Sequence, residues 1–335
     1  MGLVERWGRR KVVKDRPLLL GVPARTPKPQ AGHHGLNSMG KNRSRGANAA
    51  CLAFLILACS APALCAATSP VDAHSQHTEL DLVAEEAAAV PGETAWLGLH
   101  FVLDPGWHIY WQNPGDSGEP PRVQWHLPAG FRPGEIEWPA PERLGSGAVI
   151  DFGYSGEVLL MIPVAIPANA APGASENLAA TAKWLVCREI CIPDQAQLSL
   201  KMAIVAHPMH AATAGEALFA QFRKLIPRAV PSNWSVKAIA RGNDFILSVE
   251  TGQPEDHAAF YPFLPDPIEN SATQTVTRLS KGVQLQLHKS DQQTTPVVTL
   301  KGVLVLGDPR GSGNSSGIAA YQIAVPVPLH PVGAR

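Results

Sequence analysis

Apolar and polar residues alternate along this chain in short runs, which are separated by clusters of Gly, Pro, Asn or Asp. Residues 78–83 form one such run, and an alternation with a period of two predicts a β-strand with one buried face. Further strands are predicted at residues 95–102, 123–127, 158–166, 178–186 and 197–205. Short strands joined by turns at this spacing are typical of an antiparallel β-sandwich. The pattern therefore predicts an all-β fold, with a first domain at residues 75–206.

A second series of predicted strands follows a linker at residues 207–214. Residues 215–226 place apolar side chains at i, i+3 and i+4 and stop before Pro227, which predicts one short helix. Strands are then predicted at residues 234–239, 245–250, 273–279, 283–288, 297–306 and 319–327. The second domain is thus expected to be mainly β and sandwich-like, and to cover residues 215–328.

The N-terminal region has the order of an export signal. Basic residues at positions 41, 43 and 45 precede an apolar segment at residues 47–58, and small residues follow at 63–67. The apolar segment is shorter than the roughly 20 residues that a membrane-spanning helix needs, so cleavage is predicted rather than anchoring. We expect the remainder of the chain to be periplasmic.

Two details of this region affect what the mature protein contains. Residues 1–67 are expected to comprise an upstream extension and the signal peptide, and Met39 is a candidate for the true start. Residues 56–59 resemble a lipobox, so lipid attachment at Cys59 is the alternative to simple cleavage. Cys51 and Cys65 also fall within the predicted signal.

The charge balance narrows the class of partner. Lys and Arg number 28 and Asp and Glu also number 28, so no net field attracts nucleic acid. Asp116 and Glu119 are predicted to be turn residues, and neither forms an acid/base couple. No cofactor and no metal site are predicted from the motifs.

Cys187 and Cys191 are the cysteines outside the predicted signal. On an extended strand, positions i and i+4 lie roughly 13 Å apart, whereas a disulfide needs a Cα separation of about 4.4–6.8 Å. The three residues between them must therefore bend if the sulfurs are to meet. A disulfide that closes so short a loop contributes only about 2 kcal/mol of stability on the entropic model. Reversible thiol–disulfide exchange is the stronger reason for such a pair.

Four motifs occur in a fixed order around this pair. They are WHIYWQNPGDSG at residues 107–118, IEWP at 136–139, GY at 153–154 and WLVCREICIP at 184–193. Together they resemble the N-terminal periplasmic domain of the DsbD thiol:disulfide interchange family, especially its copper-sensitivity-suppressor relatives. The resemblance implies an immunoglobulin-like sandwich with a redox-active pair, in which Cys191 attacks and Cys187 resolves. It also associates the chain with copper tolerance and cytochrome c biogenesis.

The same resemblance implies a path for electrons. In that family the domain takes electrons from a membrane domain and passes them to periplasmic thioredoxin-like partners, as a component of a protein-disulfide reductase. This sequence ends at Arg335 without a multi-helix domain, and its cysteines have a C-x3-C spacing that is shorter than in the best-known members. The electron donor is therefore expected to be a separately encoded membrane domain, if the chain is not a fragment.

Shielding of the sulfurs is a further implication, since the family covers them with a cap loop. Residues 149–154 fall at about that position, so Asp151, Phe152 and Tyr154 are candidates for the cap, and Trp184 is a candidate to support the site. The alternative for the two aromatic residues is a core residue and a sandwich-corner tyrosine. His108 is expected to be a satisfied edge residue rather than a ligand.

Two other functions remain open at this point. Cys187 and Cys191 could hold a soft ion such as Cu(I) together with His207, Met209 and His210 in the linker. Alternatively, the chain is an extracytoplasmic sandwich whose disulfide is purely structural. Cycling between dithiol and disulfide that does not respond to chelators would separate redox exchange from both.

Overall fold

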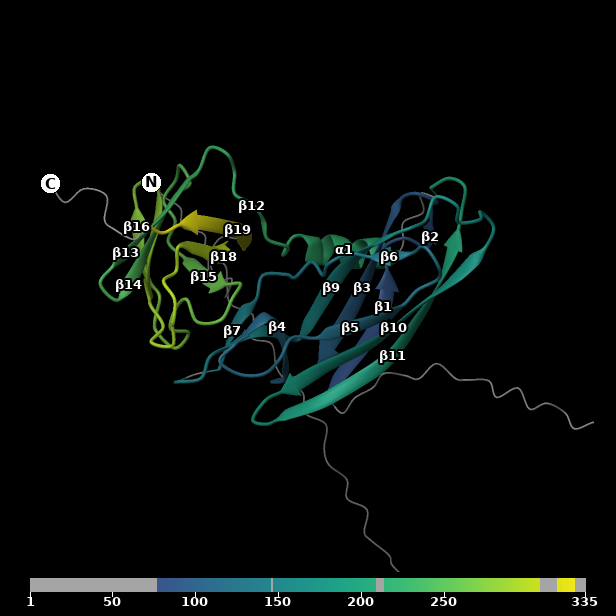
Figure 1. The fold of residues 1–335 in the computed structure, drawn as a ribbon, viewed down its shortest axis with the longest axis horizontal. Coiled ribbons are helices and arrows are strands. Elements are labelled where there is room, and N and C mark those ends of the chain that lie inside the picture. The colour runs from purple at the N-terminus through teal and green to yellow at the C-terminus, as the bar shows by residue number, and fades with distance from the viewer. Residues whose placement is uncertain (1–76, 146, 209–213, 308–317, 329–335) are drawn as a thin grey trace, which may run out of the picture. The chain divides into compact units, whose positions relative to one another are not determined.

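The computed structural model describes residues 77–145, 147–208, 214–307 and 318–328 (Figure 1). In these residues the chain forms β-strands and a single α-helix, which confirms the all-β prediction. The predicted signal and Cys51, Cys59 and Cys65 lie outside the described residues.

Eleven strands make up the first part, which we call the N-terminal sandwich (residues 77–208). They are β1 Thr78–Ala84, β2 Ala88–Ala89, β3 Thr94–Leu103, β4 His108–Gly115, β5 Arg122–His126, β6 Arg132–Pro133, β7 Glu142–Leu144, β8 Asp151–Ser155, β9 Glu157–Ala165, β10 Ser175–Cys187 and β11 Cys191–Ile204. One sheet has the order β1-β3-β9-β6, and the other has the order β2-β11-β10-β4-β8-β7, with β5 also paired to β10.

The apolar residues of the alternating strands fill the space between these two sheets. Leu97, Leu99 and Phe101 of β3 are fully buried, and they belong to the same core as Trp184 and Val186 of β10. The Phe101 and Trp184 rings meet edge to face with centroids 5.6 Å apart. Even-numbered residues of β10 therefore face the core, and odd-numbered residues such as Cys187 face away from it.

The longest pairing in this sandwich joins β10 to β11 (Figure 1). Its antiparallel register runs without interruption from the pair Ser175 and Ala203 to the pair Cys187 and Cys191. The two cysteines thus stand opposite each other at the end of a hairpin, where a bend was predicted. On its other side β10 pairs with β5 and then, at Cys187 alone, with His108 of β4.

The helix α1 spans Ala214–Arg223 and ends three residues before the predicted limit. Leu225 and Ile226 donate backbone hydrogen bonds to the carbonyls three residues earlier, a tight final turn that Pro227 follows. Phe219 and Phe222 of the helix are buried in the core of the N-terminal sandwich. The predicted helix therefore covers this core.

Eight further strands follow the helix and form the C-terminal sandwich (residues 228–328). They are β12 Arg228–Ala229, β13 Ser235–Arg241, β14 Asp244–Glu250, β15 Ala258–Pro262, β16 Thr275–Leu279, β17 Gly282–His288, β18 Thr299–Leu306 and β19 Ala319–Pro326. They make two four-stranded sheets, with the orders β12-β19-β18-β15 and β13-β14-β17-β16. The strand β15 was not predicted from the sequence.

The two sandwiches belong to one compact unit. Each has its own apolar cluster, but Tyr261, Val303 and Val305 of the C-terminal sandwich belong to the cluster of the N-terminal one. The division into two domains at the linker therefore stays a prediction. Among the described residues, no helix is both long enough and apolar enough to cross a membrane.

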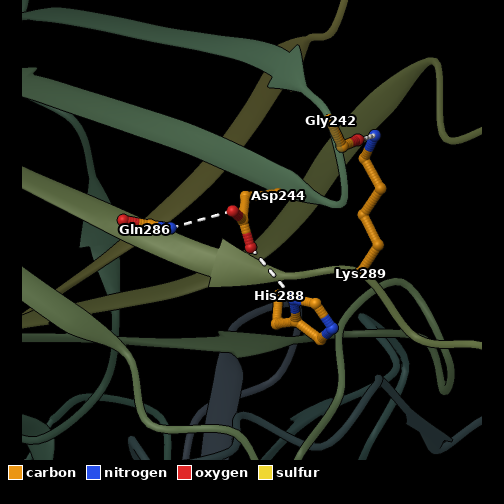
Figure 2. A network of polar contacts seen from close by, with 5 residues as sticks. All are labelled: Gly242, Asp244, Gln286, His288 and Lys289. Atoms are coloured by element: carbon orange, nitrogen blue, oxygen red, sulfur yellow. Dashed lines mark hydrogen bonds and ion pairs between the residues drawn. The ribbon is translucent and has the colours of Figure 1, made fainter.

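A polar network closes one end of the β14–β17 pair in the C-terminal sandwich (Figure 2). The Asp244 carboxylate accepts hydrogen bonds from Gln286 Nε2 at 2.8 Å and from His288 Nδ1 at 3.0 Å. Lys289 Nζ donates to the Gly242 carbonyl at 2.6 Å. These hydrogen bonds lower the pKa of Asp244, with the His288 contact as the largest cause.

Candidate functional site

Cys187 and Cys191 form a disulfide with a Cα separation of 4.1 Å. The bend between them is closed by the Arg188 N–H, which donates to the Ile190 carbonyl at 3.1 Å. The two cysteines differ in access, because Cys187 is only 2% exposed whereas Cys191 is exposed. Cys191 is therefore the more accessible residue of the pair.

Tyr110 is an aromatic residue in contact with this disulfide. Its hydroxyl oxygen lies 3.3 Å from Cys191 Sγ, a hydrogen bond that joins residues 81 positions apart. The residue is fully buried, and burial raises the pKa of Tyr110, with the Asp151 charge adding to the effect and the Ser117 hydroxyl opposing it. The phenol therefore keeps its proton at neutral pH and can donate it to the sulfur.

The residues that follow β4 hold this tyrosine in place. Gly118 has a φ of 75°, and a Cβ at that position would come within 2.1 Å of the Tyr110 ring. The Ser117 hydroxyl and backbone N–H each donate to the Asp151 carboxylate at 2.9 Å. Asp151, itself only 9% exposed, thus lies near Tyr110, and the cap or supporting role expected of it stays a prediction.

The other three predicted site residues lie on the core face of the sheet. Phe152 meets the Tyr261 ring edge to face at 5.3 Å, and Trp184 meets Phe101. The Tyr154 hydroxyl donates to the Pro139 carbonyl at 2.8 Å, and burial raises the pKa of Tyr154 well above its ordinary value. The cap and support roles expected for Phe152, Tyr154 and Trp184 therefore stay predictions, and their contacts described here are those of core residues.

His108 was expected to lie on an edge strand with its hydrogen-bonding groups paired, and both parts of this expectation are wrong. Its strand β4 lies between β10 and β8, and its Nε2 is buried without a hydrogen-bond partner. Burial lowers the pKa of His108, and the charge of Asp151 only partly opposes this. The imidazole is therefore neutral at pH 7, with an unused nitrogen.

For the Cu(I) alternative, the structure places fewer residues than the sequence suggested. Cys187 and Cys191 are joined to each other and His207 is exposed, whereas Met209 and His210 lie outside the described residues. In the described part of the chain, no group of three or more His, Cys, Asp or Glu side chains is placed to hold a metal ion.

Comparison with known proteins bears on this geometry. Residues 79–203 match the family described as thiol:disulfide interchange protein DsbD, N-terminal. This confirms the resemblance inferred from the four motifs, and the matched segment contains both cysteines, Tyr110, Ser117 and Asp151. No curated protein matches the chain.

Solved structures add support for the fold. The N-terminal periplasmic domain of ScsB from Proteus mirabilis matches with a TM-score of 0.55 and 18% identity, over 75% of this chain and 94% of that one. A protein of unknown function from Porphyromonas gingivalis W83 covers 74% of this chain and 99% of its own at 11% identity, but its TM-score of 0.18 is too low to support an argument. The immunoglobulin-like β-sandwich of the DsbD N-terminal family, followed by a second mainly β part, is thus the fold of this chain.

Proposed function

We propose that this protein exchanges thiols and disulfides with periplasmic thioredoxin-like partners through Cys187 and Cys191. The observation that carries the proposal is the disulfide at the end of the β10–β11 hairpin, where one cysteine is exposed and the other is buried. The match of this segment to the DsbD N-terminal family supports it. A periplasmic location is proposed from the same family and from the predicted signal.

The exchange has two chemical steps. In the dithiol form, the Cys191 thiolate attacks a sulfur of the partner disulfide, which forms a mixed disulfide and releases the second partner sulfur as a thiolate. Cys187 then attacks Cys191 Sγ, loses its proton and restores the internal disulfide, while the first partner sulfur leaves as a thiol. Two electrons thereby pass from the cysteine pair to the partner, and a membrane electron donor would return them.

Two observations favour the assignment of Cys191 as the attacking residue. Its exposure allows a partner sulfur to approach, whereas Cys187 is shielded. The Tyr110 hydroxyl can donate a hydrogen bond to the Cys191 sulfur, and such a bond is stronger to a thiolate than to a neutral sulfur. The exposure and the hydrogen bond both favour a reactive thiolate at Cys191.

A surface for the partner extends from the disulfide along the outward face of the hairpin. Leu185 and Pro193 are the pair next but one to the cysteines, and they line a shallow cavity of about 500 Å³ together with Lys183 and Gln195. Ile190, at the tip of the bend, is 67% exposed. An exposed apolar residue beside a reactive sulfur is suited to contact with another protein.

Trapping of the mixed disulfide tests the proposal. The Cys187→Ala variant should accumulate a covalent complex with an oxidised thioredoxin, because no resolving thiol remains, whereas Cys191→Ala should form little. Either variant should lose about 2 kcal/mol of stability or less, since the closed loop is short. Non-reducing gels of both variants measure the complex.

Two results would count against the proposal. Equal trapping by both variants would reject the roles given to the two cysteines. Absence of a complex with either, together with a parent dithiol that is not oxidised, would reject redox exchange and leave a structural disulfide.

A further inference from the structure

Two buried groups at this site bear on how a proton could leave the resolving sulfur. Cys187 is 2% exposed, so its thiol is shielded from water once the disulfide is reduced. A thiol buried in apolar surroundings resists ionisation, yet it must lose its proton to resolve the mixed disulfide. His108 Nε2 is likewise buried without a hydrogen-bond partner.

The strand pairing brings these two groups together. His108 of β4 stands directly opposite Cys187 of β10 in the antiparallel register. Residues opposed in this way point to the same face of the sheet, with their Cβ atoms about 4.5–5.5 Å apart. The His108 ring also meets the Tyr110 ring edge to face at 5.3 Å, and the Tyr110 hydroxyl contacts Cys191. His108 thus stands opposite Cys187 and beside the tyrosine that contacts Cys191.

We propose that His108 is the general base for the resolving cysteine, and that its Nε2 takes the Cys187 proton as that sulfur attacks Cys191 Sγ. This inference rests on the proposed exchange function and assigns a residue to its second step. A neutral imidazole with one unprotonated ring nitrogen is the side chain suited to this at neutral pH.

The proton and electrons balance in this step. The bond between Cys187 Sγ and Cys191 Sγ forms, and the bond from Cys191 Sγ to the partner sulfur breaks with its electron pair passing to the partner. The Cys187 proton moves to His108 Nε2, and the imidazolium then returns it to the departing partner thiolate. In the opposite direction, the imidazolium would protonate the Cys187 thiolate as it leaves.

The groups around His108 decide whether it is neutral. The charge of Asp151 favours the charged form of His108. Glu142 accepts a hydrogen bond from Ser155, which stands opposite His108 in the β4–β8 pairing. Arg188 lies over the Trp107 ring, against which His77 also stacks. Burial is the largest effect and lowers the pKa of His108, so the base form prevails at pH 7.

The test uses the full protein, glutathione disulfide as the probe and the variant His108→Gln. His126→Gln is the matched control, because His126 is exposed on the same sheet and bonds to Thr181 rather than to the cysteine pair. Each reduced protein is mixed with glutathione disulfide. Samples are quenched in acid at intervals, and the protein masses are measured by intact mass spectrometry. The glutathione adduct reports the first step, and its loss reports the second.

We expect His108→Gln to form the adduct at close to the parent rate but to resolve it at least tenfold more slowly at pH 6.5, because a general base contributes about 10²–10⁴ in rate. Its resolution rate should rise about tenfold per pH unit where the parent rate is level, since hydroxide then replaces the base. Resolution at the parent rate, with the parent pH dependence, would overturn the inference.

Failure of this inference is distinguishable from failure of the proposed function. If His108→Gln resolves normally while Cys187→Ala still traps the adduct, the exchange function stands and His108 has no role in it. If no protein forms an adduct, both are rejected. If the variant does not fold, the test is made on the parent protein, with the protonation of His108 followed by NMR. The resolution rate of the parent must fall as His108 gains a proton. A rate that is independent of this titration overturns the inference.

Discussion

Removal of the Tyr110 hydroxyl should change the reduction potential of the cysteine pair. Replacing Tyr110 by Phe deletes the oxygen that lies 3.3 Å from Cys191 Sγ and keeps the buried ring. A hydrogen bond to a charged group contributes about 1.5–3 kcal/mol and one between neutral groups about 0.5–1.5 kcal/mol. Because the Cys191 thiolate is charged and the disulfide is neutral, the hydroxyl favours the reduced form by roughly 1 kcal/mol.

This difference converts directly into a measurable potential. For a two-electron couple 30 mV corresponds to about 1.4 kcal/mol, so the potential of Tyr110→Phe should be about 20 mV more negative than that of the parent. The equilibrium with glutathione should shift about fivefold toward the disulfide. Equilibration at fixed ratios of reduced to oxidised glutathione, followed by alkylation and intact mass measurement, gives the fraction oxidised.

Tyr154→Phe is the control for this measurement. Its hydroxyl is also buried, but it donates to the Pro139 carbonyl on the core face. The variant should lose about 1 kcal/mol of stability and keep the parent potential. A Tyr110→Phe potential that equals that of the parent, or is less negative, would refute the role of the hydroxyl in favouring the thiolate.

Two further predictions concern stability. Asn113 is 1% exposed, and its Nδ2 donates to the Pro262 and Leu264 carbonyls at 2.8 and 3.1 Å. Asn113→Ala should therefore lower the free energy of unfolding, measured in urea, by about 2–3 kcal/mol. Asn177 is exposed, so the control Asn177→Ala should change it by less than about 0.5 kcal/mol. Because folding lowers the pKa of Asp244, this residue contributes stability at pH values above its pKa in the unfolded chain. That stability is lost as the pH falls through the pKa of Asp244 in the folded protein. Asp244→Asn should therefore lose less stability than the parent on acidification from pH 5 to pH 2, and an equal loss would contradict this; Asp256→Asn, which breaks the ion pair with Arg278, is the comparison.

The sequence predicted most of the fold because the strands of both sandwiches alternate clearly. The strand β15 at Ala258–Pro262 was missed since it ends in proline, and β8 at Asp151–Ser155 was missed since glycine and aspartate weaken the strand signal. The bend between Cys187 and Cys191 was predicted correctly, because the covalent geometry of a disulfide forbids an extended segment there.

The surroundings of the disulfide could be predicted only in part. Tyr110 was missed because its contact with Cys191 depends on the pairing of β4 with β10, which joins segments about 80 residues apart. His108 was assigned wrongly for the same reason, since alternation shows which face a residue occupies but not which strand lies beside it. One signal was available: a tyrosine two residues after a histidine shares its face, so finding either at the site implies the other.

The NPGDSG motif at residues 113–118 connects the chemistry to the rest of the fold. Gly118 packs against Tyr110, and Ser117 donates hydrogen bonds to Asp151. Asp116 accepts hydrogen bonds from the Ile150 N–H and from Asn270 Nδ2 of the C-terminal sandwich. Asn113 adds two more hydrogen bonds to that sandwich. The segment that holds the site tyrosine is thus hydrogen-bonded to β15 and to the loop after it, so we expect the C-terminal sandwich to help fix the position of Tyr110 beside Cys191. This gives a physical reason for the second β part in a protein whose reactive pair lies wholly in the first.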